Sequence, residues 1–328
     1  MAGVHGTPTG LALARAKHAL TAAGLDPDVE LARASSVTNE VWLSSDVAIR
    51  VNRRPDKRLF REAQLGPHLP PEVGYPEILG YGTGVGFDWL VARRRPGNVL
   101  SRCWPTMSPA QQRVAVRQLA FMLRALHATP APGGLGDINE LGPQLLRTGQ
   151  GMAPTAPLLA ALERVTTFEH VDPGAIRDIA AWVRAHGGAI EPFDVHTLVH
   201  GDLTFENVLW DGDGVTALID FEWARPAPPD LELDVLLRFC AYPQLHVAAD
   251  YEAQTRAEAY EDVPKWLRDD YPQLFEHPRC DERLRLYAIA FEVGQLLHDP
   301  PQAAPRTLTE VHPLNRLLRL LSHRSHLD

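Results

Sequence analysis

The stretch that decides the fold reads LVHGDLTFENVLW over residues 198–210 and continues as ALIDFE over residues 217–222. Short apolar runs bracket a loop in which Asp202 and Asn207 lie five residues apart. Asp220 follows thirteen residues after Asn207, at the end of another apolar run. Because short apolar runs bounded by turn residues are typical of buried strands, we predict that neighbouring strands hold these three polar side chains in place.

Phosphoryl transfer uses side chains of these types. A carboxylate orients the attacking hydroxyl and accepts its proton, while an amide oxygen and a second carboxylate hold Mg²⁺, which favours oxygen ligands. We therefore predict that Asp202 is the catalytic base and that Asn207 and Asp220 are catalytic residues that bind the metal. The alternatives are turn residues for Asp202 and Asn207 and a helix cap for Asp220, and the combined spacing makes them the weaker interpretation.

The same segment matches, with two changes, the motifs of protein kinases. Their loop H-R-D-x-x-x-x-N appears here with Gly201 in place of the Arg, and their D-F-G appears with Glu222 in place of the Gly. In this variant form the chain resembles the aminoglycoside phosphotransferase family of small-molecule kinases, over about residues 35–234. The resemblance implies an α+β, protein-kinase-like two-lobe fold, with a β-rich N-terminal lobe, a mainly helical C-terminal lobe and ATP in the cleft between them.

The resemblance also implies an activity. Members of this family use ATP or GTP with Mg²⁺ to phosphorylate a hydroxyl of a small molecule, so we expect a phosphotransferase with an alcohol group as acceptor. An antibiotic, such as an aminoglycoside or another natural product, is the favoured acceptor. A metabolic kinase for choline, homoserine or a sugar is the alternative within the same chemistry. A catalytically silent, nucleotide-binding pseudokinase is the alternative from a different class.

Residues before position 96 show the pattern of a sheet. Alternating apolar residues predict short strands within residues 31–51. A glycine-rich run at residues 82–86 separates two further predicted strands, and because no helix follows it, we interpret it as a hairpin turn rather than a phosphate loop. The other predicted elements of this part are helices at 9–23 and 58–69 and strands at 77–81 and 89–93.

The turn residues Pro96-Gly97-Asn98 mark the predicted boundary between the lobes, which are residues 1–96 and residues 97–328. Ser108 is the expected N-cap of a helix, and the apolar stripe after it predicts that this helix extends to His127. The rest of the C-terminal lobe is predicted to contain a loop-rich stretch at 129–157, helices at 158–168 and 173–186, and mainly helices after Asp234.

Two residues of the N-terminal lobe are candidate ligands of the nucleotide phosphates. Residues 47–50 read VAIR and match the kinase strand V-A-I-K, with Arg50 in place of the Lys and Glu62 as its expected ion-pair partner. An arginine keeps the positive charge but differs from lysine in reach and geometry. A surface arginine at a strand end is the alternative.

Four further residues are predicted to contact the nucleotide. The turn at residues 34–39 has no glycine, and its Ser36 and Asn39 are candidate phosphate donors; a plain hairpin turn is equally compatible with this pattern. The backbone of the linker at Ala92 and Arg93 is expected to offer hydrogen bonds to adenine. Adenosine triphosphate, with GTP as the alternative, and Mg²⁺ are thus the expected cofactors.

Three residues are predicted to support the catalytic loop. His200 is expected to pack below the loop as a hydrogen-bonding residue. Glu222 either approaches the metal or a substrate amine, or braces the loop. Asp234 resembles the family's Asp at a helix start that hydrogen-bonds the catalytic loop, and Asp230 and Glu232 are competing candidates for this contact.

The composition argues against two classes of partner, nucleic acids and membranes. The 328 residues carry a net charge of −9 without a basic cluster beyond residues 93–95, which argues against a nucleic-acid partner. No apolar run is long enough to cross a bilayer, so we expect no membrane contact and a cytoplasmic location. The three cysteines lie far apart and show no metal-binding spacing. For the oligomeric state, a monomer and a homodimer are both compatible with the sequence.

A late segment interleaves carboxylates with aromatic residues, from Tyr251 to Glu276. Such a surface suits an amine-bearing, sugar-like acceptor held by charge and stacking, and the negative net charge is compatible with a cationic acceptor. The alternative, which we favour slightly, is an ordinary solvated helix face whose aromatic residues turn inward.

Overall fold

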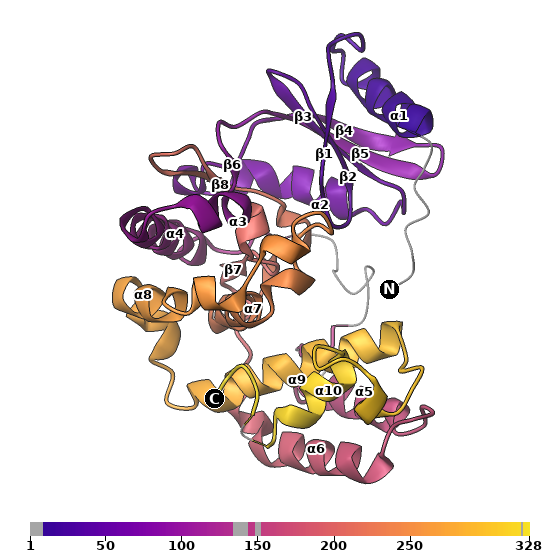
Figure 1. The fold of residues 1–328 in the computed structure, drawn as a ribbon, viewed down its shortest axis with the longest axis vertical. Coiled ribbons are helices and arrows are strands. Elements are labelled where there is room, and N and C mark those ends of the chain that lie inside the picture. The colour runs from indigo at the N-terminus through magenta and orange to yellow at the C-terminus, as the bar shows by residue number, and fades with distance from the viewer. Residues whose placement is uncertain (1–8, 134–143, 148–151, 323) are drawn as a thin grey trace.

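The computed structural model describes residues 9–133, 144–147, 152–322 and 324–328. These residues form a sheet-containing N-terminal lobe and a mainly helical C-terminal lobe (Figure 1). The predicted α+β two-lobe fold is therefore confirmed. Part of the predicted loop-rich stretch at 129–157 lies outside the described residues.

A five-stranded antiparallel sheet forms the N-terminal lobe, in the order β1-β2-β3-β5-β4. Successive residues of β5 point to opposite faces of this sheet. Trp89 and Val91 pack in one cluster with helix α1, whereas Leu90 and Ala92 pack with helix α2, so both faces are covered. The elements are α1 (Thr9–Ala22), β1 (Ala32–Ala34), β2 (Glu40–Leu43), β3 (Val47–Asn52), α2 (Arg58–Leu65), β4 (Ile78–Gly84) and β5 (Phe87–Arg93).

Helix α2 ends earlier than the sequence predicts. We expected a helix over residues 58–69, but the α-helix stops at Leu65 and a 3₁₀ turn covers Gly66–His68. Glycine weakens a helix, and Pro67 lacks the N–H group that the next turn needs. The two residues together account for the early end.

The glycine-rich run at residues 82–86 forms a hairpin, as predicted, and its first half belongs to strand β4. A Cβ atom on Gly82 would lie 2.8 Å from the ring of Trp89, and one on Gly84 would lie 2.2 Å from the ring of Phe87. These glycines therefore make room for aromatic rings on β5 and not for a phosphate group.

The C-terminal lobe is built on the long helix α4 (Pro109–His127). The Ser108 hydroxyl accepts the backbone N–H of Gln111 at 3.3 Å, and the Gln111 side chain accepts the backbone N–H of Ser108 at 3.0 Å. This capping box confirms the predicted helix start. The other helices are α3 (Leu100–Cys103), α5 (Ala156–Val165), α6 (Pro173–His186), α7 (Asp230–Ala241), α8 (Val263–Asp270), α9 (Cys280–His298) and α10 (Pro313–Arg319).

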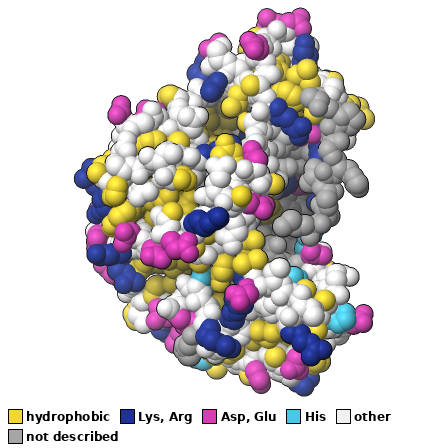
Figure 2. All heavy atoms as spheres, in the orientation of Figure 1, with side chains coloured by type: hydrophobic (Ala, Val, Ile, Leu, Met, Phe, Trp, Pro, Cys, Tyr) yellow, Lys and Arg dark blue, Asp and Glu magenta, His cyan; other side chains and the backbone are white. Residues whose placement is uncertain are grey.

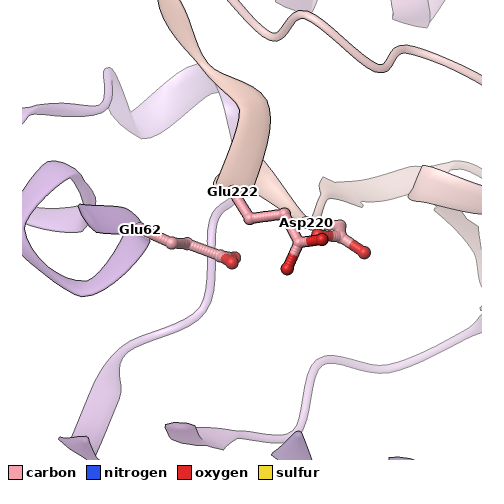
Figure 3. Close-up of side chains that lie close together, drawn as sticks. All are labelled: Glu62, Asp220 and Glu222. Atoms are coloured by element: carbon pink, nitrogen blue, oxygen red, sulfur yellow. The ribbon is translucent and has the colours of Figure 1, made fainter. Parts of the chain in front are cut away.

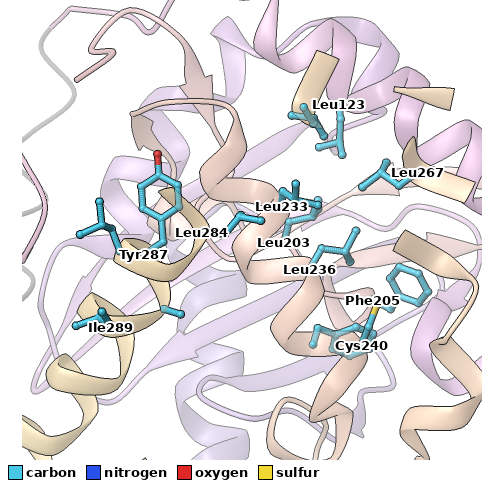
Figure 4. Close-up of a cluster of buried hydrophobic side chains, with 14 of the residues drawn as sticks. Leu123, Leu203, Phe205, Leu233, Leu236, Cys240, Leu267, Leu284, Tyr287 and Ile289 are labelled. Atoms are coloured by element: carbon cyan, nitrogen blue, oxygen red, sulfur yellow. The ribbon is translucent and has the colours of Figure 1, made fainter. Parts of the chain in front are cut away.

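The core of this lobe closes around the catalytic segment. Leu203 and Phe205 are fully buried and lie among apolar side chains of α4, α7 and α9 (Figure 4). The ring of Phe205 lies 4.8 Å from that of Trp104 and 5.2 Å from that of Phe239, measured between centroids. Since truncating a buried aromatic residue costs about 3–5 kcal/mol, this packing fixes the catalytic loop firmly in the lobe.

Two small sheets hold the ends of the catalytic segment. Strand β7 (Leu198–Val199) pairs with β10 (Arg225–Pro226), while β8 (Val208–Trp210) and β9 (Val215–Leu218) form a hairpin. Strand β6 (Asn98–Val99) pairs with the other edge of β8. The connection between the lobes is thus hydrogen-bonded directly to the strand that leaves the catalytic loop.

Three general properties of the described residues are the distribution of surface charge, the character of the helices and the state of the cysteines. Basic and acidic side chains are interspersed on the face shown in Figure 2. None of the helices that the structure describes combines the length and the apolar character of a membrane-spanning segment. Cys103, Cys240 and Cys280 are not joined by disulfides.

The connector between the lobes provides a test of the fold. Gly97 has φ +110°, and a Cβ atom there would lie 2.8 Å from the carbonyl group of Trp210. Gly212 has φ +111° but meets no atom within 4 Å. We expect both Gly97→Ala and Gly212→Ala to lose about 1–3 kcal/mol of unfolding free energy through backbone strain, and Gly97→Ala to lose about 1–3 kcal/mol more through the clash.

Urea denaturation of the two variants measures this difference. Gly212→Ala is the control, because it carries the same backbone strain while its added Cβ atom meets no other atom within 4 Å. Equal losses in the two variants would contradict the close approach of the connector to β8.

Candidate active site

A cleft of about 1870 Å³ runs between the lobes and into the helical half of the molecule. Strands of the N-terminal lobe line one side, and the catalytic segment with α7 and α9 lines the other. The cleft brings together all nine residues that the sequence predicts as catalytic or nucleotide-binding: Ser36, Asn39, Arg50, Glu62, Ala92, Arg93, Asp202, Asn207 and Asp220.

His200 fixes the start of the catalytic loop. Its side chain is fully buried, and its Nε2 lies 2.9 Å from the carbonyl oxygen of Ile219, at the end of β9. Burial lowers the pKa of His200 to about 4, so the imidazole is neutral near pH 7. A neutral, buried ring agrees with the expected supporting position and leaves His200 unsuited to act as a general base.

The contact from a helix start to the catalytic loop comes from Glu232. Its Oε1 accepts the backbone N–H of Gly201 at 2.8 Å. The sequence-based choice of Asp234 for this contact is wrong, because its Oδ2 accepts an N–H of Arg238 at 2.8 Å one turn further along α7. Helix α7 begins at Asp230, so the first turn, which faces the loop, contains Glu232 and not Asp234.

Asp202 and Asn207 face each other across the loop. The Asn207 Nδ2 donates to the backbone carbonyl of Asp202 at 2.7 Å and lies 3.5 Å from the Asp202 carboxylate. Burial, followed by the nearby carboxylates of Asp220 and Glu222, raises the pKa of Asp202 to about 8. Because the amide nitrogen of Asn207 is used in this way, its Oδ1 is the end that can bind a cation.

Asp220 adopts a backbone conformation that directs it into the cleft. It follows β9 with φ +67° and ψ +56°, in the left-handed region that few residue types other than glycine tolerate. Aspartate is one of these types, since its short polar side chain adds little steric cost. The chain then turns at once into the segment that carries Glu222.

Three carboxylates meet at the guanidinium group of Arg50. Oxygens of Glu62, Asp220 and Glu222 lie within 4.8 Å of one another (Figure 3). Arg50 pairs with Glu62, as predicted, and also with Asp220 at 2.5 Å and with Glu222 at 2.8 Å. Burial lowers the pKa of Arg50, but the carboxylates outweigh this and raise it well above its usual value, so the side chain stays charged.

Glu222 braces this cluster. In addition to Arg50, its carboxylate accepts an N–H of Arg58 at 2.9 Å and the Nδ2 of Asn39 at 3.1 Å. Its backbone carbonyl accepts an N–H of Arg61 at 3.1 Å. Of the roles left open for Glu222, the structure supports the bracing role, since these partners enclose its carboxylate.

The turn at residues 34–39 differs from the expected phosphate-binding arrangement. The Ser36 hydroxyl donates to the backbone carbonyl of Asn39, and the Asn39 amide points at Glu222. Neither donor is therefore directed at a phosphate in this structure. The alternative of a plain hairpin turn that lines the cleft describes it better.

One of the expected adenine contacts, the backbone N–H of Arg93, is already used within the protein. The backbone N–H of Arg93 donates to the carbonyl of Glu77 at 2.8 Å, and that of Arg94 donates to Asp46 at 2.8 Å. Ala92 is buried within the sheet, opposite Ala48. The N–H of Arg93 is thus used within the N-terminal lobe and is not free for adenine.

The acidic and aromatic segment from Tyr251 to Glu276 is mostly not part of the cleft. Tyr260 is buried against Trp104, and Asp270 pairs with Arg113 of α4. Only Tyr251 and Glu252 of this segment line the cleft among the described residues. The alternative interpretation, with the aromatic residues turned inward, is confirmed.

Two contacts at the site were not predicted. Arg58 bonds Glu222, and the Tyr75 hydroxyl donates to Glu62 at 2.8 Å. Arg58 lies four residues before Glu62 and therefore on the same face of α2, a spacing that could have indicated it. Tyr75 lies in an irregular connector, where the sequence carries no comparable signal.

Comparisons with known proteins agree with this geometry. Residues 31–269 match the model of the phosphotransferase enzyme family, whereas no curated protein matches the chain. A thermostable mutant of aminoglycoside phosphotransferase APH(4)-Ia, in a ternary complex with ADP and hygromycin B, is similar with a TM-score of 0.55 and 18% identity, covering 86% of this chain and 90% of that one.

Two further solved structures are similar over nearly their whole length. The GDP complex of an aminoglycoside 2'-phosphotransferase-IIIa mutant has a TM-score of 0.58 and 18% identity, with 90% of this chain and 92% of that chain covered. The streptomycin-ATP-APH(2'')-IIa ternary complex has a TM-score of 0.57 and 15% identity, with 90% and 92% covered. At these identities the likeness shows the fold.

The fold and the cleft define a protein-kinase-like enzyme that acts on small molecules. The family match spans well over half of the sequence, and the chain belongs to the phosphotransferase enzyme family. It is a nucleotide-binding phosphotransferase that uses an alcohol group as acceptor.

The contact between Glu232 and Gly201 gives a prediction. Glu232→Ala removes the acceptor of a partly buried backbone N–H, so we expect a loss of about 1–3 kcal/mol of unfolding free energy. Glu232→Gln keeps an amide oxygen at the same place and should lose much less. Chemical denaturation of both variants measures the effect, and a Gln variant as unstable as the Ala variant would argue against this hydrogen bond.

Proposed function

We propose that this protein is an ATP- and Mg²⁺-dependent O-phosphotransferase for a natural-product antibiotic, acting in the cytoplasm, where ATP is supplied. The observation that carries the proposal is the convergence of Asp202, Asn207 and Asp220 on one cleft with the Arg50–Glu62 pair. GTP is the alternative phosphate donor. The antibiotic class is supported by two of the solved structures above, which are complexes with hygromycin B and with streptomycin.

The residues present suit a magnesium ion. Asn207 has its nitrogen bonded to Asp202, which leaves its oxygen for a cation, and Asp220 adds a carboxylate next to two others. Hard oxygen donors of this kind are what Mg²⁺ prefers. The bound ion would neutralise charge on the phosphates and on these carboxylates.

Asp202 then has a defined task in the transfer. Its carboxylate orients the acceptor hydroxyl and takes up the hydroxyl proton. The hydroxyl oxygen forms a bond to the γ-phosphorus of ATP, and the bond from this phosphorus to the β-phosphate oxygen breaks. The products are a phosphate monoester and ADP, and the proton leaves Asp202 for solvent.

The proposed role of Asp202 as the base can be tested by substitution. Asp202→Ala should lower kcat by about 10²–10⁴-fold with little change in nucleotide affinity, because the side chain acts on the hydroxyl and not on ATP. ADP release and nucleotide titration measure the two quantities. Asp213→Ala, in the exposed turn of the β8–β9 hairpin, is the matched control and should behave like the unchanged protein. Near-full activity of Asp202→Ala would exclude it as the base.

The metal ligand is testable separately. Asp220→Ala should weaken the binding of Mg·ATP and make nucleotide affinity nearly independent of Mg²⁺, since a principal ligand is lost. Calorimetric titration of ATP with and without Mg²⁺ measures this. A variant with unchanged Mg²⁺ dependence would refute the assignment.

One observation favours a second candidate, the catalytically silent nucleotide-binding protein. Arg50 replaces the usual lysine and is bonded to Asp220 itself. Mg²⁺-dependent ADP release against a panel of aminoglycosides, macrolides, nucleoside antibiotics, choline and sugars decides between the candidates. A product lost in Asp202→Ala supports the enzyme, and a choline or sugar product identifies a metabolic kinase. Nucleotide binding without any turnover supports the silent protein.

A further inference from the structure

The cleft has a second half that the nucleotide site does not use. Helix α7 starts beside the catalytic loop, where Glu232 contacts Gly201, and helix α9 packs against α7. Each helix turns residues spaced at i, i+3, i+4 and i+7 toward the cleft, which is one face of a helix. We call this surface the acceptor wall: Leu231, Asp234, Val235 and Arg238 of α7, and Tyr287, Ala290, Phe291 and Gly294 of α9.

Most of the acceptor wall is apolar or aromatic. The neighbouring loops extend it with more residues of the same kind, which line the same cleft: Leu145, Leu146, Phe193, Leu245, Val247 and Val311. Ligand pockets bind through such surfaces when the ligand itself presents apolar area. This half of the cleft therefore favours a molecule with a broad apolar face.

The charges on the acceptor wall are already paired. Asp234 bonds Arg238 at 2.8 Å, and both side chains are almost fully buried. The guanidinium carbon of Arg238 also lies 3.5 Å from the ring centroid of Phe291. Next to it, Arg316 bonds Glu292 at 2.7 Å. A positively charged ligand would have to compete with Arg238 for Asp234, whose Oδ2 is bonded and whose Oδ1 is buried without a hydrogen-bond partner.

The remaining carboxylates are few for a polycation. Among the described residues that line the cleft outside the proposed nucleotide and catalytic site, the carboxylates other than Asp234 are Glu206, which bonds Arg102, and Glu252 and Asp299. A ligand with several ammonium groups needs several acidic partners, because an unpaired buried charge is costly. Among the described residues, two of these four carboxylates, Asp234 and Glu206, already bond arginines.

We propose that the acceptor is a hydroxylated molecule with a broad apolar face and at most one positive charge. The proposal rests on the phosphotransferase function above and names its substrate class. It also replaces the cationic acceptor that the sequence left open. The acceptor packs against Val235 and Phe291 and presents its hydroxyl to Asp202 at the adjacent end of α7.

The cleft has open space in front of Gly294 on the acceptor wall. A Cβ atom on Gly294 meets no atom within 4 Å, so the cleft is open in front of it. A larger side chain at this position can extend into the cleft without displacing the protein around it. The position is therefore suited to test what the wall binds.

The first experiment compares two classes of acceptor. ADP release by the full-length protein with Mg·ATP is measured at low and high salt with a macrolide and an alkyl glucoside, and with hygromycin B and streptomycin. We expect turnover of the apolar group, with kcat/KM changing less than about threefold with salt, because uncharged contacts are not screened. Preference for the polycations, with kcat/KM falling about tenfold or more in high salt, would overturn the inference.

This design separates the inference from the function on which it rests. If the polycations are phosphorylated and the product is lost in Asp202→Ala, the phosphotransferase function stands and only the apolar acceptor is wrong. If neither group is phosphorylated and ADP release does not depend on Asp202, both fail.

The second experiment changes the wall itself. Gly294→Leu should raise KM for the best acceptor by about tenfold or more and leave KM for ATP within about twofold, as expected when only acceptor contacts are lost. Gly133→Leu is the matched control, since Gly133 also meets no atom within 4 Å but does not line the cleft. An unchanged acceptor KM in a folded Gly294→Leu protein would overturn the inference.

Two substitutions at position 294 that differ only in charge test the charge of the ligand. Gly294→Asp and Gly294→Asn differ only in the negative charge that they place in the cleft. For an apolar acceptor, KM should be no lower with Asp than with Asn. A KM that is about tenfold lower with Asp at low salt would show a polycationic acceptor and contradict the proposal.

Discussion

The guanidinium group of Arg50 is the interaction on which the active site depends. It lies on the N-terminal sheet and bonds Glu62 of α2 together with Asp220 and Glu222 of the C-terminal lobe. Arg58 adds a second cation, so two positive charges face three carboxylates. A buried carboxylate is costly without its partner, and these ion pairs therefore hold the two lobes together at the proposed phosphate and metal site.

Local patterns in the sequence were sufficient to predict most of the architecture. The apolar runs around Asp202 predicted β7, β8 and β9, and the stripe after Ser108 predicted α4 together with its cap. These predictions succeeded because periodicity and capping depend on neighbours within a few residues. Where local signals conflicted, as at Gly66-Pro67, the helix end was misplaced by about one turn.

Side-chain partners far apart in the sequence could not be predicted in the same way. Asn39 was expected to face phosphate but reaches Glu222, 183 residues away. The choice between Glu232 and Asp234 depended on which side of α7 faces the loop, and that follows from the packing of the whole lobe. The N–H of Arg93 is taken by the carbonyl group of Glu77, just before β4, and this pairing across two strands has no local signal in the sequence.

The pairing of β6 with β8 has a consequence for how the enzyme moves. From Asn98 onward the chain is hydrogen-bonded to strand β8. A rotation of one lobe relative to the other must therefore pivot before this residue, near Gly97. Asp202 and Asn207 then travel with the helices that line the acceptor side, while Arg50 travels with the opposite lobe. Opening and closing would therefore change the separation of Arg50 from Asp220 and leave Asp202 stationary with respect to helices α7 and α9.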